Sequence, residues 1–236
     1  MKRYLIGLLA LIMIAACHRT SPDDFSAGEL SLIRQADSIM RVLTIDDPAD
    51  VQTLRAVSRD FSAEALLSED FARLSELMVA TVTHPSQDGV GIAGPQVGLN
   101  KRVVAVQRFD KEPVMNASGK LDHPFEVYPN IRIVCLSDST AYGAEGCLSV
   151  PDMRADVLRS TEVVIEYADL QQLQENRLRQ IPDASSDNTR KTRTLRNTIS
   201  GSEVIPMKRD TISGFTAVIF QHEIDHLEGI LYIDRL

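Results

Sequence analysis

Two stretches in the first half of the chain carry apolar residues at helical spacing. The first runs from Glu29 to Leu43, and the run 46–48 (Asp-Asp-Pro) ends its pattern. The second runs from about Glu69 to Val82, with Ser68 placed to cap its first turn. Its apolar positions share one face, namely Phe71, Leu74, Leu77, Met78 and Thr81. Both patterns predict amphipathic helices.

Strand patterns follow in the middle of the chain. Residues 102–107, 125–136 and 154–168 are rich in β-branched and other apolar residues, and Pro129 indicates an edge or a bulge in the second run. Residues 111–123 include proline and glycine and predict a loop or a hairpin. Cys135, near the end of the second strand, is expected to be a small buried apolar residue.

Residues 171–209 are polar and show no clear period. Eight basic against four acidic residues give this segment a net charge of +4 within an acidic chain. A basic insert could touch anionic lipid or a partner. Its composition favours a solvated loop without fixed structure.

The last apolar stretch, residues 215–229, contains the string His-Glu-Ile-Asp-His at 222–226. One helical turn separates His222 from His226, so both imidazoles can bind one metal ion while Glu223 lies beside it. The alternative is a solvated helix face that carries two unrelated histidines. Because apolar residues lead into the string, the helix is expected to be buried, and buried unpaired imidazoles would be costly. Burial therefore favours the metal site.

Two turns upstream of this helix carry groups suited to the same site. Residues 89–99 are rich in glycine but match a phosphate loop only weakly, since no Lys-Ser/Thr follows. Glycine instead permits close approach of the backbone, and Gln96 is then a neutral donor and acceptor suited to a carbonyl. Residues 144–151 predict a turn between two strands, where the thiol of Cys147 can supply a third metal ligand.

The start of the chain has the pattern of a targeting segment. Met1-Lys2-Arg3 is basic, and the uncharged, mainly apolar run from Tyr4 to Ala16 is short for a permanent membrane-spanning helix. Residues 14–17 (Ile-Ala-Ala-Cys) resemble a bacterial lipobox, in which Cys17 becomes the lipidated first residue after cleavage. An uncleaved anchor is the alternative. His18, in place of an aspartate, resembles sorting to the outer membrane, so we expect a lipid-anchored protein of the bacterial cell envelope.

Composition restricts the possible partners. Lys and Arg number 25 against 33 Asp and Glu, and the resulting net charge of −8 argues against nucleic acid as a ligand. Three cysteines define no disulfide framework by number alone. A chain of 236 residues is long enough for one domain with a substantial core plus appendages.

Three motifs stand in order along the chain: residues 89–96 (Gly-Val-Gly-Ile-Ala-Gly-Pro-Gln), 145–149 (Glu-Gly-Cys-Leu-Ser) and 221–226 (Gln-His-Glu-Ile-Asp-His). Together they resemble the three signature motifs of peptide deformylases, and the resemblance extends from about Leu54 to Asp234 apart from the polar insert. It implies an α+β fold in which mixed β-sheets surround a central metal-binding helix. It also implies removal of the formyl group from N-formylmethionyl peptides, with release of formate.

The resemblance implies roles for individual residues. Cys147, His222 and His226 would bind one divalent ion, ferrous iron as is usual in the family or zinc in an oxidising compartment. Glu223 would be the general base and then the acid, while Gln96 and the Leu148 N–H would stabilise the developing oxyanion. The substrate pocket would be lined by Val90, Gly91, Gly146, Phe215, Val218 and Ile219. The chain departs from the family pattern at Gly94-Pro95 and at Tyr128.

Three functions are compatible with these motifs. The first is an exported deformylase, and the second is an exported metallopeptidase or amidase with the same machinery and a changed pocket. The third is a surface-anchored binding protein, but binding alone needs neither a base nor an oxyanion donor. The expected organisation is a signal peptide at 1–16, a tether and N-terminal helix at 17–50, and a catalytic domain at 51–236 with a polar insert at about 171–209.

Overall fold

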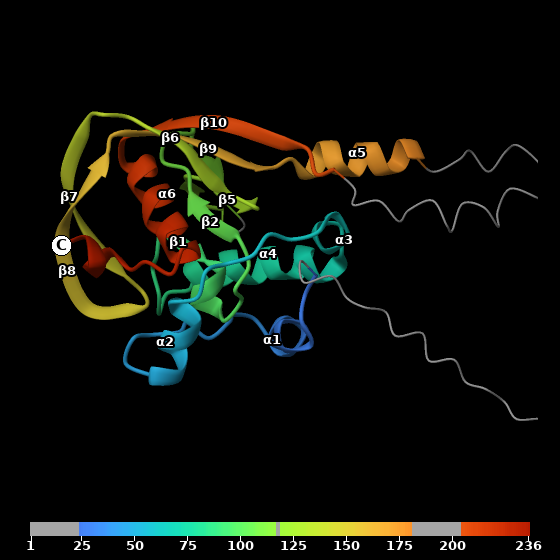
Figure 1. The fold of residues 1–236 in the computed structure, drawn as a ribbon, viewed down its shortest axis with the longest axis horizontal. Helices are drawn as coiled ribbons and strands as arrows, with labels where there is room; N and C mark the ends of the chain where they lie inside the picture. Colours follow the sequence, from blue (N-terminus) through green and yellow to red (C-terminus); the bar gives the residue numbers. More distant parts are fainter. Residues whose placement is uncertain (1–23, 117–118, 181–203) are drawn as a thin grey trace, which may run out of the picture.

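The structure, a computed structural model, describes residues 24–116, 119–180 and 204–236 (Figure 1). The expected signal peptide, the lipobox with Cys17 and most of the tether lie outside the described residues, as does the greater part of the polar insert. Over the described ranges, none of the helices combines the length and apolarity needed to cross a membrane.

A three-stranded antiparallel sheet forms the centre of the fold. It contains β1 (Gly91–Ala93), β2 (Val103–Gln107) and β5 (Phe125–Pro129) in the order β1-β2-β5. Every residue of β2 is buried, and successive side chains enter different cores: Val103 and Ala105 join one cluster, while Val104 and Val106 join another. Alternation along a strand therefore gives the sheet two covered faces.

One face of this sheet is covered by the helix α4 (Glu69–Val82). The helices α1 (Ala27–Gln35) and α3 (Ala63–Leu66) pack against α4, and α2 (Pro48–Leu54) packs against residues 94–97. The boundaries expected for α4 are confirmed, and the Ser68 hydroxyl accepts the Phe71 N–H at its start. The prediction of one helix over 29–43 is wrong, because α1 ends at Gln35. Beyond it, the Met40 N–H donates to the Thr81 hydroxyl at 2.8 Å, so tertiary contacts replace the helical bond.

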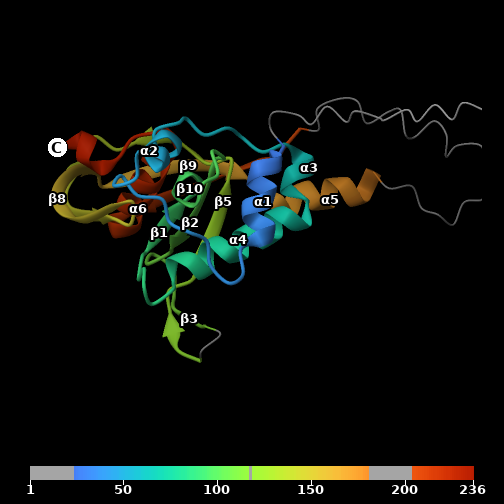
Figure 2. The same cartoon turned by 90° about the horizontal axis from the view of Figure 1, so that it is seen from below.

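A second antiparallel sheet lies on the other side of the long helix α6 (Gly214–Leu227). It contains β6 (Arg132–Leu136), β9 (Glu162–Ala168) and β10 (Met207–Ser213) in the order β10-β9-β6. The chain passes directly from β10 into α6, whose residues contact β1, β2, β6, β8, β9 and β10 (Figures 1 and 2). The expected α+β class with a central helix is confirmed. Every paired strand of the described chain is antiparallel, so no mixed sheet is found there.

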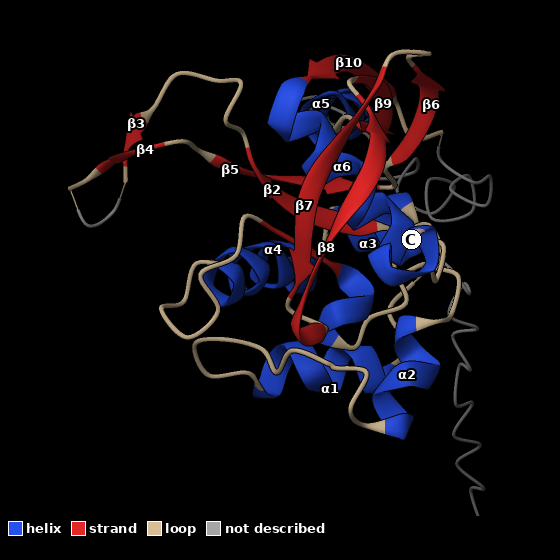
Figure 3. Cartoon of the chain, turned by 90° about the vertical axis from the view of Figure 1, so that its left-hand side faces the viewer, coloured by secondary structure: helices blue, strands red, loops and turns tan. Residues whose placement is uncertain are grey.

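Two hairpins complete the fold. The hairpin of β3 (Val114–Met115) and β4 (Leu121–Asp122) projects from the body, as expected for residues 111–123 (Figure 3). The longer hairpin of β7 (Thr140–Cys147) and β8 (Val150–Ser160) places its turn beside α6. The predicted turn at 144–151 is therefore present, with Cys147 as the last residue of β7.

Two strands expected to be continuous are divided. Residues 125–136 form β5 and β6 in different sheets, because Asn130 adopts a left-handed φ of 52° and its amide bonds the backbone of Phe61. Residues 154–168 likewise fall in β8 and β9. The expected burial of Cys135 is wrong: β6 is an edge strand with an irregularity between Ile133 and Cys135, and the thiol is exposed.

The polar segment after residue 170 is partly regular, which corrects the expected loop. Residues 170–180 form α5 (Leu170–Gln180), and the Asp169 carboxylate caps its first turn by accepting the Gln172 N–H at 3.0 Å. Leu173 is fully buried against the main core. Leu170 is partly buried against the same core, and strong helix formers such as Leu, Gln, Glu and Arg fill the rest of the segment.

Candidate active site

Three metal-binding side chains converge beside α6. His222 and His226 are one turn apart on this helix, and Cys147 ends β7 opposite them. Their possible ligand atoms all lie within 4.8 Å of one another. The Cys147 Sγ is 3.2 Å from the His226 Nε2. A sulfur and two imidazole nitrogens at this spacing form a donor set suited to zinc or ferrous iron.

A buried chain of ion pairs orients the first histidine. The His222 Nδ1 is 2.7 Å from a carboxylate oxygen of Glu145, which leaves Nε2 to face the cluster. Arg159 holds Glu145 through two hydrogen bonds of 2.7 and 3.0 Å, and its third nitrogen donates to Asp225 at 2.5 Å. A carboxylate behind a ligating histidine fixes its tautomer and ring orientation.

The electrostatics of this cluster favour a cation. Burial alone would raise the pKa of Glu145, but hydrogen bonds from His222 and Arg159 outweigh it and lower the pKa to about 2. Burial would lower the pKa of His222, yet hydrogen bonds with Cys147 and Glu145 raise it to about 10. The pKa of His226 falls well below its usual value because of burial and the charge of His222. In the metal-free protein the cluster therefore holds a proton on His222 and leaves His226 neutral.

Glu223 lies directly against the backbone of β1. A Cβ added to Gly91 would stand 2.4 Å from the Glu223 Oε1, so only glycine permits this approach. Burial raises the pKa of Glu223 to about 7, with the charge of Glu145 acting in the same direction. Its Oε2 is buried and has no hydrogen-bond partner within the described chain. The carboxylate is therefore positioned and tuned to exchange a proton near neutral pH.

Gln96 is fixed in one orientation on the short helix η1 (Gly94–Val97). Its carbonyl oxygen accepts the Ala93 N–H at 2.8 Å, so its amide nitrogen must point the other way. That nitrogen lies 3.2 Å from the Ser149 hydroxyl and 3.5 Å from the Cys147 Sγ. A neutral donor thus faces the metal-binding cluster, as its expected role requires.

A cavity of about 740 Å³ opens over these groups. The structure brings all the residues proposed for substrate binding and chemistry, except His226, to its lining: Val90, Gly91, Gln96, Gly146, Cys147, Leu148, Phe215, Val218, Ile219, His222 and Glu223. Its rim also carries charged residues absent from the sequence-based prediction, namely Asp88, Asp152 and Arg154. This volume is typical of a pocket for a small or peptide-like ligand.

Comparison with known proteins agrees with this geometry. The family model described as polypeptide deformylase matches residues 39–180 and 197–236. The chain belongs to the polypeptide deformylase family. It is a metallohydrolase that removes formyl groups from peptides. A peptide deformylase from Leptospira biflexa is 31% identical over 199 residues, which cover 84% of this chain and 88% of that protein. Peptide deformylase 2 of Gloeobacter violaceus is 34% identical, with 78% and 74% covered.

Solved deformylases have the same fold. The class I type b peptide deformylase of Acinetobacter baumannii bound to Met-Ala-Ser superimposes with a TM-score of 0.59 at 29% identity, covering 84% of this chain and 98% of that one. Its actinonin-bound form gives a TM-score of 0.58 at 29% identity, with 85% and 99% covered.

The departures from the deformylase motifs lie away from the cavity lining. A Cβ on Gly94 would meet the Lys101 carbonyl oxygen at 2.5 Å, so the turn after β1 requires glycine there. The Tyr128 hydroxyl bonds Arg108 and donates to Glu126 at 2.5 Å behind α6. Both departures therefore belong to the supporting structure of this deformylase.

Sequence reasoning missed the supporting residues of the site. Arg159 and Asp225 carry the ion-pair chain behind His222, and Ser149 donates its N–H toward the Cys147 Sγ at 3.4 Å. Glu145 belongs to a recognised motif, but its contact with His222 joins positions 77 residues apart. Other charged residues stand near Arg159 and Asp225 in sequence, so no local pattern distinguished the buried members of the network.

Proposed function

We propose that this deformylase acts on N-formylmethionyl peptides, with Cys147, His222 and His226 holding one divalent ion and Glu223 moving the proton. The observation that carries the proposal is the convergence of these donors, the buried carboxylate of Glu223 and the oriented amide of Gln96 on one cavity. When bound, the ion supplies hydroxide near neutral pH by lowering the pKa of water.

Glu223 has two tasks in this reaction. Its unpartnered carboxylate oxygen accepts the proton of the attacking water, as the water oxygen bonds to the formyl carbon. The same oxygen then returns this proton to the peptide nitrogen as the C–N bond breaks. Formate and a free amino terminus are the products. A carboxylate with a pKa of about 7 suits both transfers near neutral pH.

Gln96 stabilises the charge that develops on the formyl oxygen. Its amide nitrogen is already aimed at the cluster, since Ala93 holds its carbonyl oxygen in place. The Leu148 N–H, one residue after Cys147 on the cavity wall, is the second donor. Pre-aimed donors of this kind contribute about 3 kcal/mol each to the transition state.

The cavity walls suit a methionine side chain. Apolar side chains of Val90, Val218 and Ile219 line it beside the metal-binding cluster, and Phe215 stands at the mouth with 56% of its surface exposed. The Acinetobacter baumannii enzyme was crystallised with Met-Ala-Ser, a peptide that begins with methionine. We assign the formyl-methionine residue to this part of the cavity and the following residues to its charged rim.

The ion is ferrous iron by analogy with the family, and zinc replaces it in an oxidising compartment, where an iron-bound thiolate is vulnerable.

The first residues of the chain indicate where the protein is located. Residues 1–16 act as a signal peptide, and Cys17 receives the acyl chains that hold the enzyme at the bacterial envelope, at the outer membrane where there are two. Cys17→Ser should abolish acylation, and unchanged membrane partition of this variant would refute the anchor.

Product analysis tests the substrate. The metal-loaded protein is incubated with formyl-Met-Ala-Ser, and products are separated by mass. We expect stoichiometric formate and intact Met-Ala-Ser. Cleavage of a peptide bond without formate would instead favour the metallopeptidase or amidase, and no reaction on any formylated peptide would overturn the proposed function.

A further inference from the structure

The first described residues, Asp24 and Phe25, are held against the body of the protein by hydrogen bonds and packing near the start of α3. The Asp24 carboxylate accepts a hydrogen bond from the Ser62 hydroxyl at the start of α3, and its carbonyl oxygen accepts one from the Lys101 ammonium at 2.7 Å. Phe25 is buried and packs edge-on against Phe61 at 5.3 Å. The chain therefore enters the body at α3.

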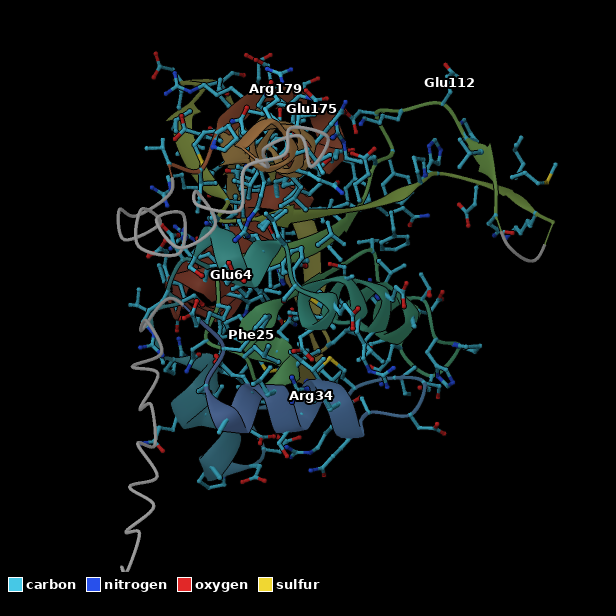
Figure 4. The ribbon with its side chains drawn as sticks, turned by 90° about the vertical axis from the view of Figure 1, so that its right-hand side faces the viewer. Phe25, Arg34, Glu64, Glu112, Glu175 and Arg179 are labelled. Atoms are coloured by element: carbon cyan, nitrogen blue, oxygen red, sulfur yellow. The ribbon has the colours of Figure 1, made fainter. Side chains whose placement is uncertain are left out.

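The helix α5 ends at the same place. The Arg177 guanidinium is 2.6 Å from the Glu64 carboxylate of α3. Figure 4 shows this end of the molecule face-on, with Phe25, Glu64, Glu175 and Arg179 all toward the viewer. We call it the α3–α5 end, defined by Asp24, Glu64, Leu178 and Arg179.

The chemistry of the last turn of α5 suits a lipid surface. Leu178 is 61% exposed although it is a large apolar residue. Arg177 and Arg179 flank it in sequence, and the Arg179 side chain is 73% exposed. Arg177 is paired with Glu64, whereas the more exposed Arg179 has only the 3.4 Å contact with Glu175. The exposed leucine can enter the headgroup region while the Arg179 guanidinium exchanges that contact for a lipid phosphate.

The wall of the active-site cavity that β7 and β8 form lies on the side of the molecule away from α3 and α5. The strands β7 and β8, which carry Cys147 and Arg154, are separated from α3 and α5 by the central sheet in both Figure 1 and Figure 2. A folded domain of about 200 residues has a radius of gyration of about 16 Å, which corresponds to about 40 Å across.

The length of the tether restricts the orientation. Seven chain steps separate Cys17 from Asp24. At about 3.5 Å per step they reach about 25 Å at most, which is less than the width of the domain. With Cys17 acylated, Asp24 stays close to the bilayer, and the β7–β8 end cannot be turned onto the lipid.

We propose that the α3–α5 end faces a phospholipid bilayer, with Leu178 and Arg179 at the headgroups, and that the active-site cavity stands away from the lipid. The inference rests on the proposed lipid anchor at Cys17. The cavity therefore receives peptides from the aqueous phase, and a peptide embedded in the same bilayer is a poor substrate.

Energy transfer to the bilayer tests this orientation. The full chain is produced in bacterial membranes, purified in its acylated form and reconstituted into vesicles of phosphatidylethanolamine and phosphatidylglycerol. In a Cys135→Ser background, a donor dye is attached through Leu178→Cys or, as a matched control at the other end, Leu158→Cys. Both leucines are exposed, so neither change disturbs the core. Acceptor dye is carried on lipid headgroups, and metal is kept bound to protect Cys147.

We expect transfer from position 178 to be several-fold stronger than transfer from position 158. Equal or reversed transfer, with acylation confirmed by mass, would overturn the orientation and leave the proposed function intact. A protein without acyl chains that stays in the soluble fraction would overturn the anchor and the orientation together, while formate release would continue unchanged.

Discussion

The contact between Gly91 and Glu223 gives a sharp test of the catalytic base. Replacing Gly91 with alanine places a methyl group 2.4 Å from the Glu223 Oε1 and 2.9 Å from its Cδ and Cγ. Ordinary contacts of this kind are about 3.4 Å or longer, so the carboxylate must move by about 1 Å. A displacement of about 1 Å in a catalytic group costs about 10²-fold in rate. Gly91→Ala should therefore lower kcat by about 10²-fold.

The assay is continuous formate release, measured beside metal content and thermal unfolding. Metal content should stay at the parent value, because Glu223 is not among the three converging ligands. Gly143→Ala is the matched control: Gly143 is also in a strand, but an added Cβ there meets nothing within 4 Å. Its activity should equal that of the parent. Full activity of Gly91→Ala, or an equal loss of activity in Gly143→Ala, would refute a specific clash between position 91 and Glu223.

Three further predictions follow from the ion-pair chain and the buried base. Glu145→Gln removes the charge behind His222 and should weaken metal affinity by about 10- to 100-fold, measured by competition with a chelating dye; an unchanged affinity would contradict its supporting role. Arg159→Ala removes the guanidinium shared by two buried carboxylates, leaving Glu145 with His222 and Asp225 with Arg235, and should lower the free energy of unfolding by about 3–5 kcal/mol. The exposed pair of Arg209 with Glu166 is the control, and Arg209→Ala should cost less than about 1 kcal/mol by denaturant titration. Finally, burial raises the pKa of Glu223 to about 7, so kcat/KM should fall as the pH drops below about 7 and the base is protonated. A level profile down to about pH 5 would exclude Glu223 as the base.

The pKa of Glu223 also has a consequence for stability. Its value in the folded metal-free protein, about 7, is higher than that of an ordinary glutamate, so between these values the folded state binds more protons than the unfolded state. The contribution of Glu223 to the free energy of unfolding of the metal-free protein should therefore decrease as the pH rises from about 4.5 to about 7, while His226, whose folded-state pKa is lowered, contributes in the opposite direction. In denaturant titrations, the slope of the free energy of unfolding against pH should be more positive in Glu223→Gln than in the parent, and an identical slope in both proteins would refute this contribution.

Local sequence patterns correctly predicted those parts of the fold that depend on residues close in sequence. The apolar stripe and Ser68 cap of α4 define its limits, and the His222 to His226 spacing places two imidazoles on one face. Contacts between residues far apart in sequence determined the features that were predicted wrongly. The helix from Glu29 ended early because Met40 finds its hydrogen-bond acceptor on α4.

Burial in strands also depended on partners that are remote in sequence. Cys135 is exposed because its strand has a neighbour on one side only and an irregular register with it. The pairing of Arg159 with Asp225 spans 66 residues, so no local spacing reveals it. The glycine-rich motif at residues 89–99 predicted that the backbone there approaches another group closely. It did not reveal that this group is Glu223, which lies against Gly91.

The central claim is that Glu223 acts as the proton carrier of a metal-dependent deformylation at this cavity. It is tested most directly by the rate of formate release from formyl-Met-Ala-Ser, compared between the metal-loaded parent and Glu223→Ala at equal metal content. We expect release by the parent and a loss of about 10²- to 10⁴-fold in the variant. A variant that releases formate at the parent rate, or a parent that releases none, would contradict it.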